Sequence, residues 1–459
     1  PEVDAPEVEA AEETVAPRAS TAPPSAGAPL VATDAAASAT AHDGEGGKGR
    51  RTRIAPPPKP PWWRRAAFAV AMVVFVAAIP ALGYTGSRLI AESKAGDFQG
   101  STLGPTDPGF EAQVEPTPTA LAIQYDDEGV PNSLTFLSMS GDAGGTVVFV
   151  PLDTELAVAK FGIGNVRLAW EATPRDQPTL GRDRIVNQVA SILNVGIQEP
   201  IELTNASWEQ LVAPVGPLKI DNPDAIDLGF GITIPSGETE LPANLVGAYL
   251  AKRVDGESDL TRLVRHEAVW RAWLDQVGEA GTDDAVPGET GAGIGRFVRV
   301  LAAGDVDIQT LPTDPSKSGP NLYARDQAAI NRLMTDAVAS PTAATPGSRF
   351  TVRLLNGVSP DAIPGEFVHQ LVGMGGAVTI LGNGPEFDTD ETTVVYGDPA
   401  MKATATFVAA ALGAKGEVRF DREAPDTVDL TIVLGNDLLG EVSSGDGLPG
   451  STVPTDEGD

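Results

Sequence analysis

The stretch SLTFLSMSGDAGGTVVFVPLDT (133–154) sets the fold of the first folded region of this chain. Apolar and β-branched residues dominate SLTFLSM (133–139) and TVVFVPL (146–152), while GDAGG (141–145) between them is typical of a turn. The pattern therefore predicts two adjacent strands joined by a tight connection. Asp153 follows the second strand directly, so we expect its carboxylate to lie just beyond the edge of a sheet.

Segments with a helical spacing of apolar residues follow these two strands. They are RIVNQVASIL (184–193), ASWEQLV (206–212) and DLTRLVRHEAVWRAWLDQV (259–277), and Ser258 is placed to cap the last of them. A mixed order of strands and helices is typical of an α/β or α+β sandwich. We therefore expect a mixed-sheet α/β domain over residues 119–338.

A second, smaller folded region is expected over residues 350–439, after a linker rich in Pro, Ala and Ser at 339–349. Its strand and helix patterns are FTVRLLNG (350–357), a helix at 366–372, AVTIL (377–381), TTVVY (392–396), a helix at 400–412 and VDLTIVLG (428–435). This order predicts a compact α/β module. The Gly-, Ser- and Asp-rich residues 440–459 are expected to form a flexible tail.

One apolar stretch earlier in the chain is long enough to cross a membrane. Residues 66–84 are uncharged and mostly apolar, which is near the lower bound for a helix spanning about 30 Å of hydrocarbon. Lys and Arg crowd its amino side, so residues 1–60, expected to be a disordered tail, should be cytoplasmic. The folded regions would then lie outside the membrane on a stalk at 89–118. The alternative, a cleaved signal peptide, is disfavoured by the long segment before the stretch.

The composition excludes several classes of function. The chain has 459 residues and a formal net charge of −31, with 63 Asp and Glu against 32 Lys and Arg. A chain so acidic repels phosphate backbones, so we expect no nucleic-acid partner, although the charge also serves solubility. Cysteine is absent, which excludes a disulfide framework, a zinc ribbon and thiol catalysis.

Basic side chains on the third predicted helix could bind a phosphate group. Arg262 and Arg265 are three residues apart and therefore share a helix face, and Arg253 lies shortly upstream. Guanidinium groups suit a pyrophosphate because each can donate two hydrogen bonds to a pair of oxygens. The alternative is a solvated face paired with the neighbouring acids, which are Asp255, Glu257, Asp259 and Glu267. Asp153 could be a Mg²⁺ ligand, although an aspartate at that position is often a turn or cap residue.

The order of these segments resembles the LytR-CpsA-Psr (LCP) family of actinobacterial and other Gram-positive cell envelopes. The matching stretches are PNSLTFLSMS (131–140), VVFVPLDT (147–154), YLAKR (249–253), DLTRLVRH (259–266) and DVDIQTLP (305–312), the last resembling the family's closing strand. The second region resembles the LytR C-terminal domain through LLNG (354–357), TTVVYGD (392–398) and DLTIVLG (429–435).

The resemblance implies an LCP-like sandwich, followed by the C-terminal module, in a membrane-anchored protein of cell-wall assembly. Its partners would be the membrane and a polyprenyl-pyrophosphate-linked glycopolymer or wall polymer. Family members transfer such polymers to peptidoglycan, with arginines on the pyrophosphate and Mg²⁺ on acidic side chains. At the matching positions, Arg253, Arg262 and Arg265 would bind pyrophosphate and Asp153 would bind Mg²⁺.

Three positions depart from the family pattern. Asn132 stands for the first aspartate, Leu152 for the arginine before Asp153, and Ala251 for the first arginine of the Tyr-x-Arg-x-Arg segment. Losing one charge-assisted contact to a developing phosphate charge typically costs about 3–4 kcal/mol, so we assign no catalytic residue. We expect polymer binding with weak or no transfer, and an active ligase is the alternative. The family's label as transcriptional attenuators suggests direct DNA control, which the absence of a helix-turn-helix pattern on the cytoplasmic side disfavours.

Overall fold

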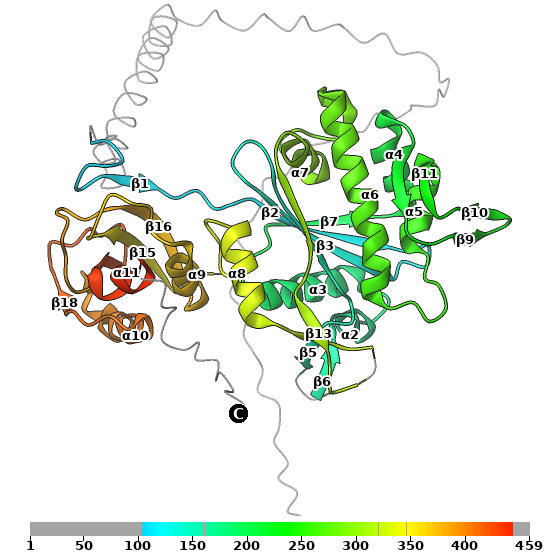
Figure 1. Ribbon diagram of the computed structural model, residues 1–459. Helices are drawn as coiled ribbons and strands as arrows, with labels where there is room; N and C mark the ends of the chain where they lie inside the picture. Colours follow the sequence, from blue (N-terminus) through cyan, green and yellow to red (C-terminus); the bar gives the residue numbers. More distant parts are fainter. Residues whose placement is uncertain (1–102, 159–161, 320, 346, 444–459) are drawn as a thin grey trace, which may run out of the picture. The chain divides into compact units, whose positions relative to one another are not determined.

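The computed structural model describes residues 103–158, 162–319, 321–345 and 347–443 (Figure 1). The predicted cytoplasmic tail (1–60), the predicted membrane span (66–84) and most of the predicted C-terminal tail (440–459) lie outside these residues. Within the described ranges, no helix is both long enough and apolar enough to cross a membrane.

A five-stranded mixed sheet forms the centre of the first folded region. Its strand order is β12 (Val306–Thr310), β4 (Gly145–Val150), β3 (Pro131–Met139), β2 (Thr119–Tyr125) and β7 (Glu199–Leu203). The middle strand β3 is antiparallel to both neighbours, whereas the outer strands β12 and β7 run parallel to theirs. The two strands predicted around the Gly-rich turn are confirmed as β3 and β4, and the mixed α/β class is confirmed with them.

Two apolar cores lie on opposite faces of this sheet, because successive residues of a strand point to opposite sides. One core joins Leu137 and Phe149 of the sheet to α4 (Asn205–Val212), α5 (Ala243–Ala251), α6 (Asp259–Ala280) and α7 (Gly293–Ala302). The other joins Leu134 and Val150 to α2 (Val166–Glu171), α3 (Pro178–Leu193) and α8 (Gln327–Ala337). The three predicted helices are confirmed as α3, α4 and α6, and Ser258 caps α6 by accepting a hydrogen bond from the Thr261 N–H at 3.1 Å.

The turn between β3 and β4 requires glycine. Gly145 has a φ of +147°, and a Cβ at that position would lie 2.1 Å from the backbone oxygen of Ser138. Gly141 also has a positive φ, of +58°, but a Cβ there would meet nothing within 4 Å. The same substitution therefore tests two different constraints, conformation alone at Gly141 and conformation with a backbone clash at Gly145.

We expect Gly145→Ala to lower the free energy of unfolding by about 3 kcal/mol, because the clash adds to the conformational cost. Gly141→Ala is the matched control and should cost about 1 kcal/mol. Chemical denaturation of both variants checks the difference. Equal destabilisation by the two substitutions would contradict the close approach of β3 and β4.

The C-terminal region folds around a six-stranded mixed sheet. Its strand order is β1 (Glu111–Gln113), β16 (Gly376–Asn383), β15 (Phe350–Asn356), β19 (Leu430–Leu434), β17 (Thr393–Tyr396) and β18 (Val418–Phe420). The helices of this region are α9 (Gly365–Gly373), α10 (Lys402–Leu412) and α11 (Asn436–Ser443). Each strand and helix predicted between 350 and 435 is confirmed. The edge strand β1 was not predicted, and it lies within the segment expected to be a stalk.

Four two-stranded sheets complete the described part of the first region. They pair β5 (Glu155–Val158) with β6 (Gly162–Asn165), β8 (Leu218–Asn222) with β11 (Gly237–Leu241), β9 (Ile226–Gly229) with β10 (Ile232–Ile234), and β13 (Thr313–Pro315) with β14 (Tyr323–Arg325). The β9–β10 hairpin projects away from the sheet and its helices (Figure 1).

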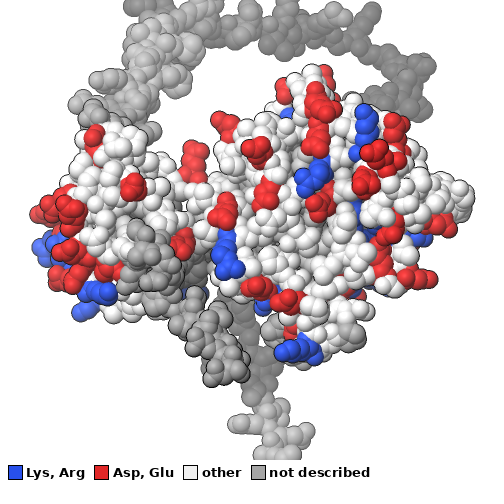
Figure 2. Space-filling view, viewed as in Figure 1, with Lys and Arg blue, Asp and Glu red and all other residues white. Residues whose placement is uncertain are grey.

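Acidic side chains outnumber basic ones over the face drawn in Figure 2, in line with the net negative charge of the sequence.

Candidate functional site

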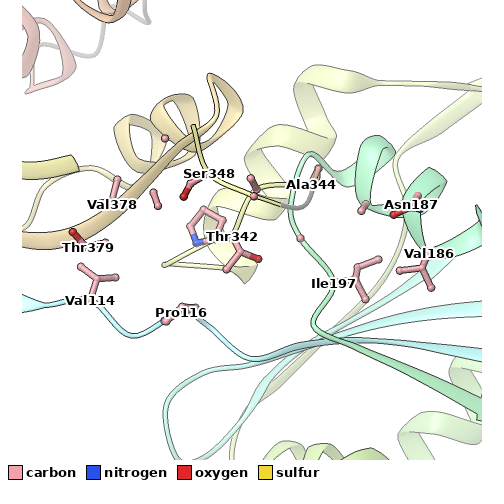
Figure 3. A pocket seen from close by; sticks show the side chains of 17 residues that line it. Val114, Pro116, Val186, Asn187, Ile197, Thr342, Ala344, Ser348, Val378 and Thr379 are labelled. Carbon is pink, nitrogen blue, oxygen red and sulfur yellow. The ribbon is translucent and has the colours of Figure 1, made fainter. Parts of the chain in front are cut away.

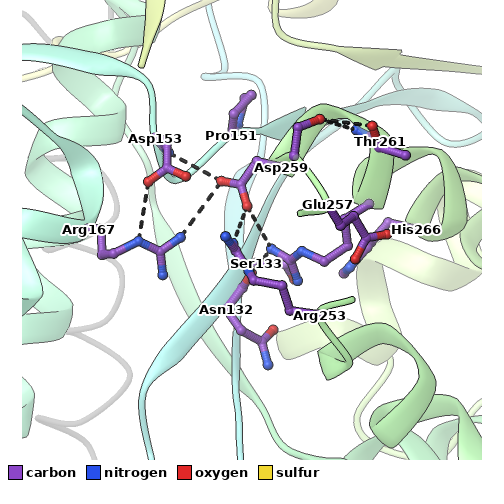
Figure 4. A network of polar contacts seen from close by, with 12 residues as sticks. Asn132, Ser133, Pro151, Asp153, Arg167, Arg253, Glu257, Asp259, Thr261 and His266 are labelled. Atoms are coloured by element: carbon purple, nitrogen blue, oxygen red, sulfur yellow. Dashed lines mark hydrogen bonds and ion pairs between the residues drawn. The ribbon is translucent and has the colours of Figure 1, made fainter. Parts of the chain in front are cut away.

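The four predicted site residues come from two loops and the start of one helix. Strand β4 ends at Val150, and Pro151 leads into a turn at residues 152–153. Asp153 therefore lies beyond the end of the strand. Arg253 follows the end of α5 at Ala251, and Arg262 and Arg265 lie in the first two turns of α6. Figure 4 shows Asp153 and Arg253 on either side of Asp259. Arg262 pairs with Asp259, and Arg265 pairs with Glu257 one turn away, so all four predicted side chains belong to one polar network.

Asp259 is the centre of this cluster. Its side chain is fully buried, and its Oδ1 forms ion pairs with Arg253 and, at 3.4 Å, with Nη2 of Arg262. Its Oδ2 lies 3.8 Å from Nη2 of Arg167 and accepts a 3.3 Å hydrogen bond from the backbone N–H of Asp153. Three arginines therefore share one buried carboxylate, and Figure 4 shows this carboxylate between Arg167 and Arg253.

Arg262 is buried deeply enough for its charge to be costly. Its side chain is 2% exposed, and it donates to the backbone oxygens of Leu250, at 3.3 Å, and of Asn132. Burial lowers the pKa of Arg262 to about 10, and the Asp259 carboxylate opposes that shift. Within the described residues, its Nε has no hydrogen-bond partner.

Arg265 is equally buried and has more unpaired donors. Its Nη2 donates to the backbone oxygen of Lys252 at 2.7 Å and to Oε2 of Glu257 at 2.9 Å. Its guanidinium carbon lies 5.5 Å from the centroid of the Tyr249 ring, a cation–π contact. Its Nε and Nη1 find no partner in the part of the chain that the structure describes. Burial lowers the pKa of Arg265, and Glu257 opposes the shift.

Asn132 adds a neutral amide to the cluster at the start of β3. The residue is 9% exposed, and neither atom of its side-chain amide has a hydrogen-bond partner among the described residues. Buried polar groups are normally paired, because leaving one unpaired costs about 1–3 kcal/mol. The unpaired donors are Nδ2 of Asn132, Nε of Arg262, and Nε and Nη1 of Arg265, and each could donate to an anionic oxygen.

Asp153 is placed less favourably as a resident metal ligand. Its Oδ1 accepts hydrogen bonds from Nδ2 of Asn165 at 3.0 Å and from Nε of Arg167 at 3.3 Å. Burial raises the pKa of Asp153, and the nearby Asp259 carboxylate raises it further. The described ranges hold no group of three or more His, Asp or Glu side chains that could enclose a metal ion. Fewer than three such side chains therefore meet at Asp153, so Mg²⁺ would need further oxygens from a ligand.

The alternative of a solvated arginine face is wrong in one respect. Arg262 and Arg265 are buried rather than solvated, because α6 packs this face against the ends of α5 and β3. They are nevertheless paired with acidic side chains, Asp259 and Glu257, as that alternative expected. The cluster is thus cationic but partly neutralised.

Two central residues were not predicted as members of the site. Arg167 lies at the start of α2 in no recognisable motif, so no local signal marks it. Asp259 was interpreted as one of several neighbouring acids, although its position directly after the cap residue Ser258 favours a carboxylate at the helix N-terminus. The spacing of residues in the sequence does not indicate that Asp259 is buried.

The positions that depart from the family pattern are apolar or neutral here. Leu152 is 1% exposed and belongs to the core on the α3 side of the sheet, so it does not fill the space under α6. That space is filled instead by Trp208, Trp270 and Trp273, whose ring centroids lie 5.3–5.7 Å apart. All three are essentially fully buried, so the core under α6 is closed by indole rings.

A cavity of about 400 Å³ has none of the four predicted site residues in its lining (Figure 3). Val114, Pro116, Ile197 and Val378 contribute to its lining, together with the hydroxyl-bearing Thr342. No charged side chain is among the described residues that line it. It therefore offers an anion much less than the cluster around Asp259 does.

His266 makes stability depend on pH. It is fully buried one residue after Arg265, and its Nε2 lies 3.2 Å from the backbone oxygen of Leu250. Burial, and then Arg262 and Arg265, lower the pKa of His266 well below its usual value. The unfolded chain takes up a proton at this histidine near pH 6.5 and the folded chain does not, so acid favours unfolding.

As the pH drops below 6.5, we expect His266 to lower the free energy of unfolding by up to about 1.4 kcal/mol per pH unit. The raised pKa of Asp153 acts in the opposite sense, because protonation of that carboxyl favours the folded state. Denaturation of the wild type and of His266→Gln between pH 7 and 5 isolates the contribution of the histidine. An equal slope for both proteins would refute a buried neutral imidazole.

A comparison with known protein families identifies the family of the C-terminal module. Residues 349–438 match the family described as LytR cell envelope-related transcriptional attenuator. This region is therefore a LytR C-terminal domain, as its motifs indicated. The match covers less than half of the chain, and no curated protein sequence matches the chain significantly.

Structural neighbours of the chain are LCP proteins. Bacillus subtilis TagV shares 16% identity, with 48% of this chain and 96% of that chain covered and a TM-score of 0.38. An LCP enzyme from Actinomyces oris shares 19% identity over 50% of this chain and 96% of its own, with a TM-score of 0.36. TagT with bound octaprenyl pyrophosphate lipid shares 13% identity over 52% and 92%, with a TM-score of 0.38.

Proposed function

We propose that this chain is a membrane-anchored envelope protein that binds the pyrophosphate end of a lipid-linked or wall glycopolymer and transfers it weakly or not at all. The observation that carries the proposal is the buried set of unpaired N–H donors on Arg262, Arg265 and Asn132. Guanidinium donors prefer phosphate oxygens because the charge and the forked geometry both match. The LytR C-terminal domain supports a role in the cell envelope.

Binding is favoured over transfer because part of the cationic charge at the site is already neutralised. Asp259 and Glu257 neutralise part of the charge of Arg262 and Arg265, and Leu152 and Ala251 supply no charge. Each missing charge-assisted contact to a developing phosphate charge is worth about 3–4 kcal/mol of barrier. A site with several such losses can hold a ground-state anion more easily than it can stabilise a transition state.

In this proposal Mg²⁺ enters with the ligand. The oxygens of a pyrophosphate would complete the coordination that Asp153 alone begins, since Mg²⁺ commonly binds one or two carboxylates plus phosphate oxygens. The chemistry that the ion supplies is neutralisation of phosphate charge. Arg167 and Asn165 hold the Asp153 carboxylate in place.

The proposed location follows from the sequence before the described residues. Residues 66–84 would anchor the chain in the cell membrane as a single span, with the amino terminus in the cytoplasm. The sheet with its arginine cluster would then lie outside, where carrier lipids expose their polymers. Protease added to wall-stripped cells should digest the folded regions.

A paired assay separates binding from transfer. The full chain is incubated with a polyprenyl-pyrophosphate-linked glycopolymer and Mg²⁺, and bound polymer and polymer joined to peptidoglycan are measured separately. We expect binding without appreciable transfer. Turnover by the wild type that is lost in Arg262→Ala would instead establish the ligase, and absence of binding would overturn the proposal.

A further inference from the structure

The tip of the β9–β10 hairpin exposes an aromatic side chain completely. Phe230 has a relative exposure of 106%, the highest among the large apolar side chains that the structure describes, and Ile232 beside it is 41% exposed. The hairpin projects away from the sheet and its helices (Figure 1). The tip is therefore convex, and it presents apolar surface to whatever lies beyond the fold.

The backbone at this tip does not favour phenylalanine. Gly229, Phe230 and Gly231 have φ angles of +88°, +53° and +79°. Asn or Gly is preferred at the first central position of a two-residue turn with positive φ, and a bulky residue there is rare. Phe230 thus occupies a strained position while its side chain is fully exposed, so no packing within the fold explains it. A residue held in this way points to a role outside the fold.

We propose that Phe230 and Ile232 insert into the interfacial layer of a lipid bilayer. Aromatic side chains favour this layer, and a small convex apolar tip can enter it without a preformed pocket in a partner. The inference rests on the proposed membrane anchoring, because one short apolar tip binds a bilayer only weakly without a second attachment. The exposed Asp227 on β9, close to the tip, favours zwitterionic over anionic headgroups.

The hairpin is linked structurally to the arginine cluster. β9 contacts α5, and Tyr249 of α5 donates a 2.7 Å hydrogen bond to Asn222 at the end of β8. The same Tyr249 ring lies under the guanidinium of Arg265. Insertion of the tip would therefore orient the cluster with respect to the membrane surface.

Spin labelling can test the insertion because the chain contains no cysteine. Phe230→Cys in the full chain gives a single labelling site, and Phe407→Cys on α10, where Phe407 is 57% exposed, gives a matched control. Both labelled proteins are reconstituted into phosphatidylcholine vesicles. Collision of each label with a water-soluble nickel complex and with oxygen is then measured, and flotation of the vesicles reports anchoring.

We expect the label at position 230 to be about tenfold less accessible to the nickel complex than the label at position 407, and more accessible to oxygen. Vesicles containing phosphatidylglycerol should weaken this difference. Equal accessibility of the two labels in floated vesicles would overturn the insertion while leaving the anchoring intact. A label at 230 shielded from both reagents would indicate a protein contact and would also overturn it. Failure of the chain to float would overturn insertion and anchoring together.

Discussion

Asp259→Ala is expected to lower the free energy of unfolding of the first folded region by about 3–5 kcal/mol. The Asp259 carboxylate is fully buried and is the acidic partner of Arg262, whose side chain is 2% exposed. Its removal leaves a buried guanidinium without a counter-charge, beside Arg167 and Arg253, which also face the lost carboxylate. Urea denaturation followed by tryptophan fluorescence measures the effect, because Trp208, Trp270 and Trp273 report on the core under α6.

An exposed ion pair on the same helix provides the control. Glu267 pairs with Arg271 at 3.0 Å, and both side chains are 40% or more exposed. Glu267→Ala should therefore change stability by less than about 1 kcal/mol. If the two variants were equally stable, the buried network would not be a structural centre of this region.

Arg265→Met is expected to weaken pyrophosphate binding by about 10- to 100-fold, which corresponds to the loss of charged hydrogen bonds. This residue contributes the unpaired donors Nε and Nη1, and methionine preserves much of its buried apolar contact. Arg262 is less suitable for the test, because its loss would also leave Asp259 with one partner fewer. Calorimetric titration of the full chain with inorganic pyrophosphate and Mg²⁺ measures the change.

Arg271→Met is the matched control for binding. Arg271 lies on the same helix, but its side chain is 53% exposed and pairs with Glu267. Its replacement should leave the affinity within about twofold, apart from a small effect of net charge. Equal weakening by both variants would indicate that pyrophosphate binds through general charge rather than in the buried cluster.

The sequence predicts those parts of the fold that local patterns encode. The spacing of Leu263, Trp270 and Trp273 specified α6, and Ser258 specified its start, because capping and periodicity depend on neighbours in the chain. The turn glycines between β3 and β4 specified that hairpin in the same way. The pairing of β1 with β16 joins Glu111 to Gly382, and no local pattern could predict contacts between residues so far apart.

The same limit applies to the candidate site. The arginines on one face of α6 were recognisable because three-residue spacing brings side chains together. Their burial, and the sharing of Asp259 with Arg167 of α2, depend on how α6 and α2 meet at the end of the sheet. Trp208 of α4 packs against two tryptophans of α6. This packing also depends on the tertiary structure, so local sequence patterns did not predict it.

A crystal structure of the full chain with pyrophosphate and Mg²⁺ tests the central claim most directly. Our account predicts electron density for the anion within hydrogen-bond distance of Arg265 and the Asn132 amide, with a phosphate oxygen near the free donor of Arg262. Pyrophosphate bound elsewhere, or a cluster that stays closed around Asp259 while the anion remains in solution, would contradict it.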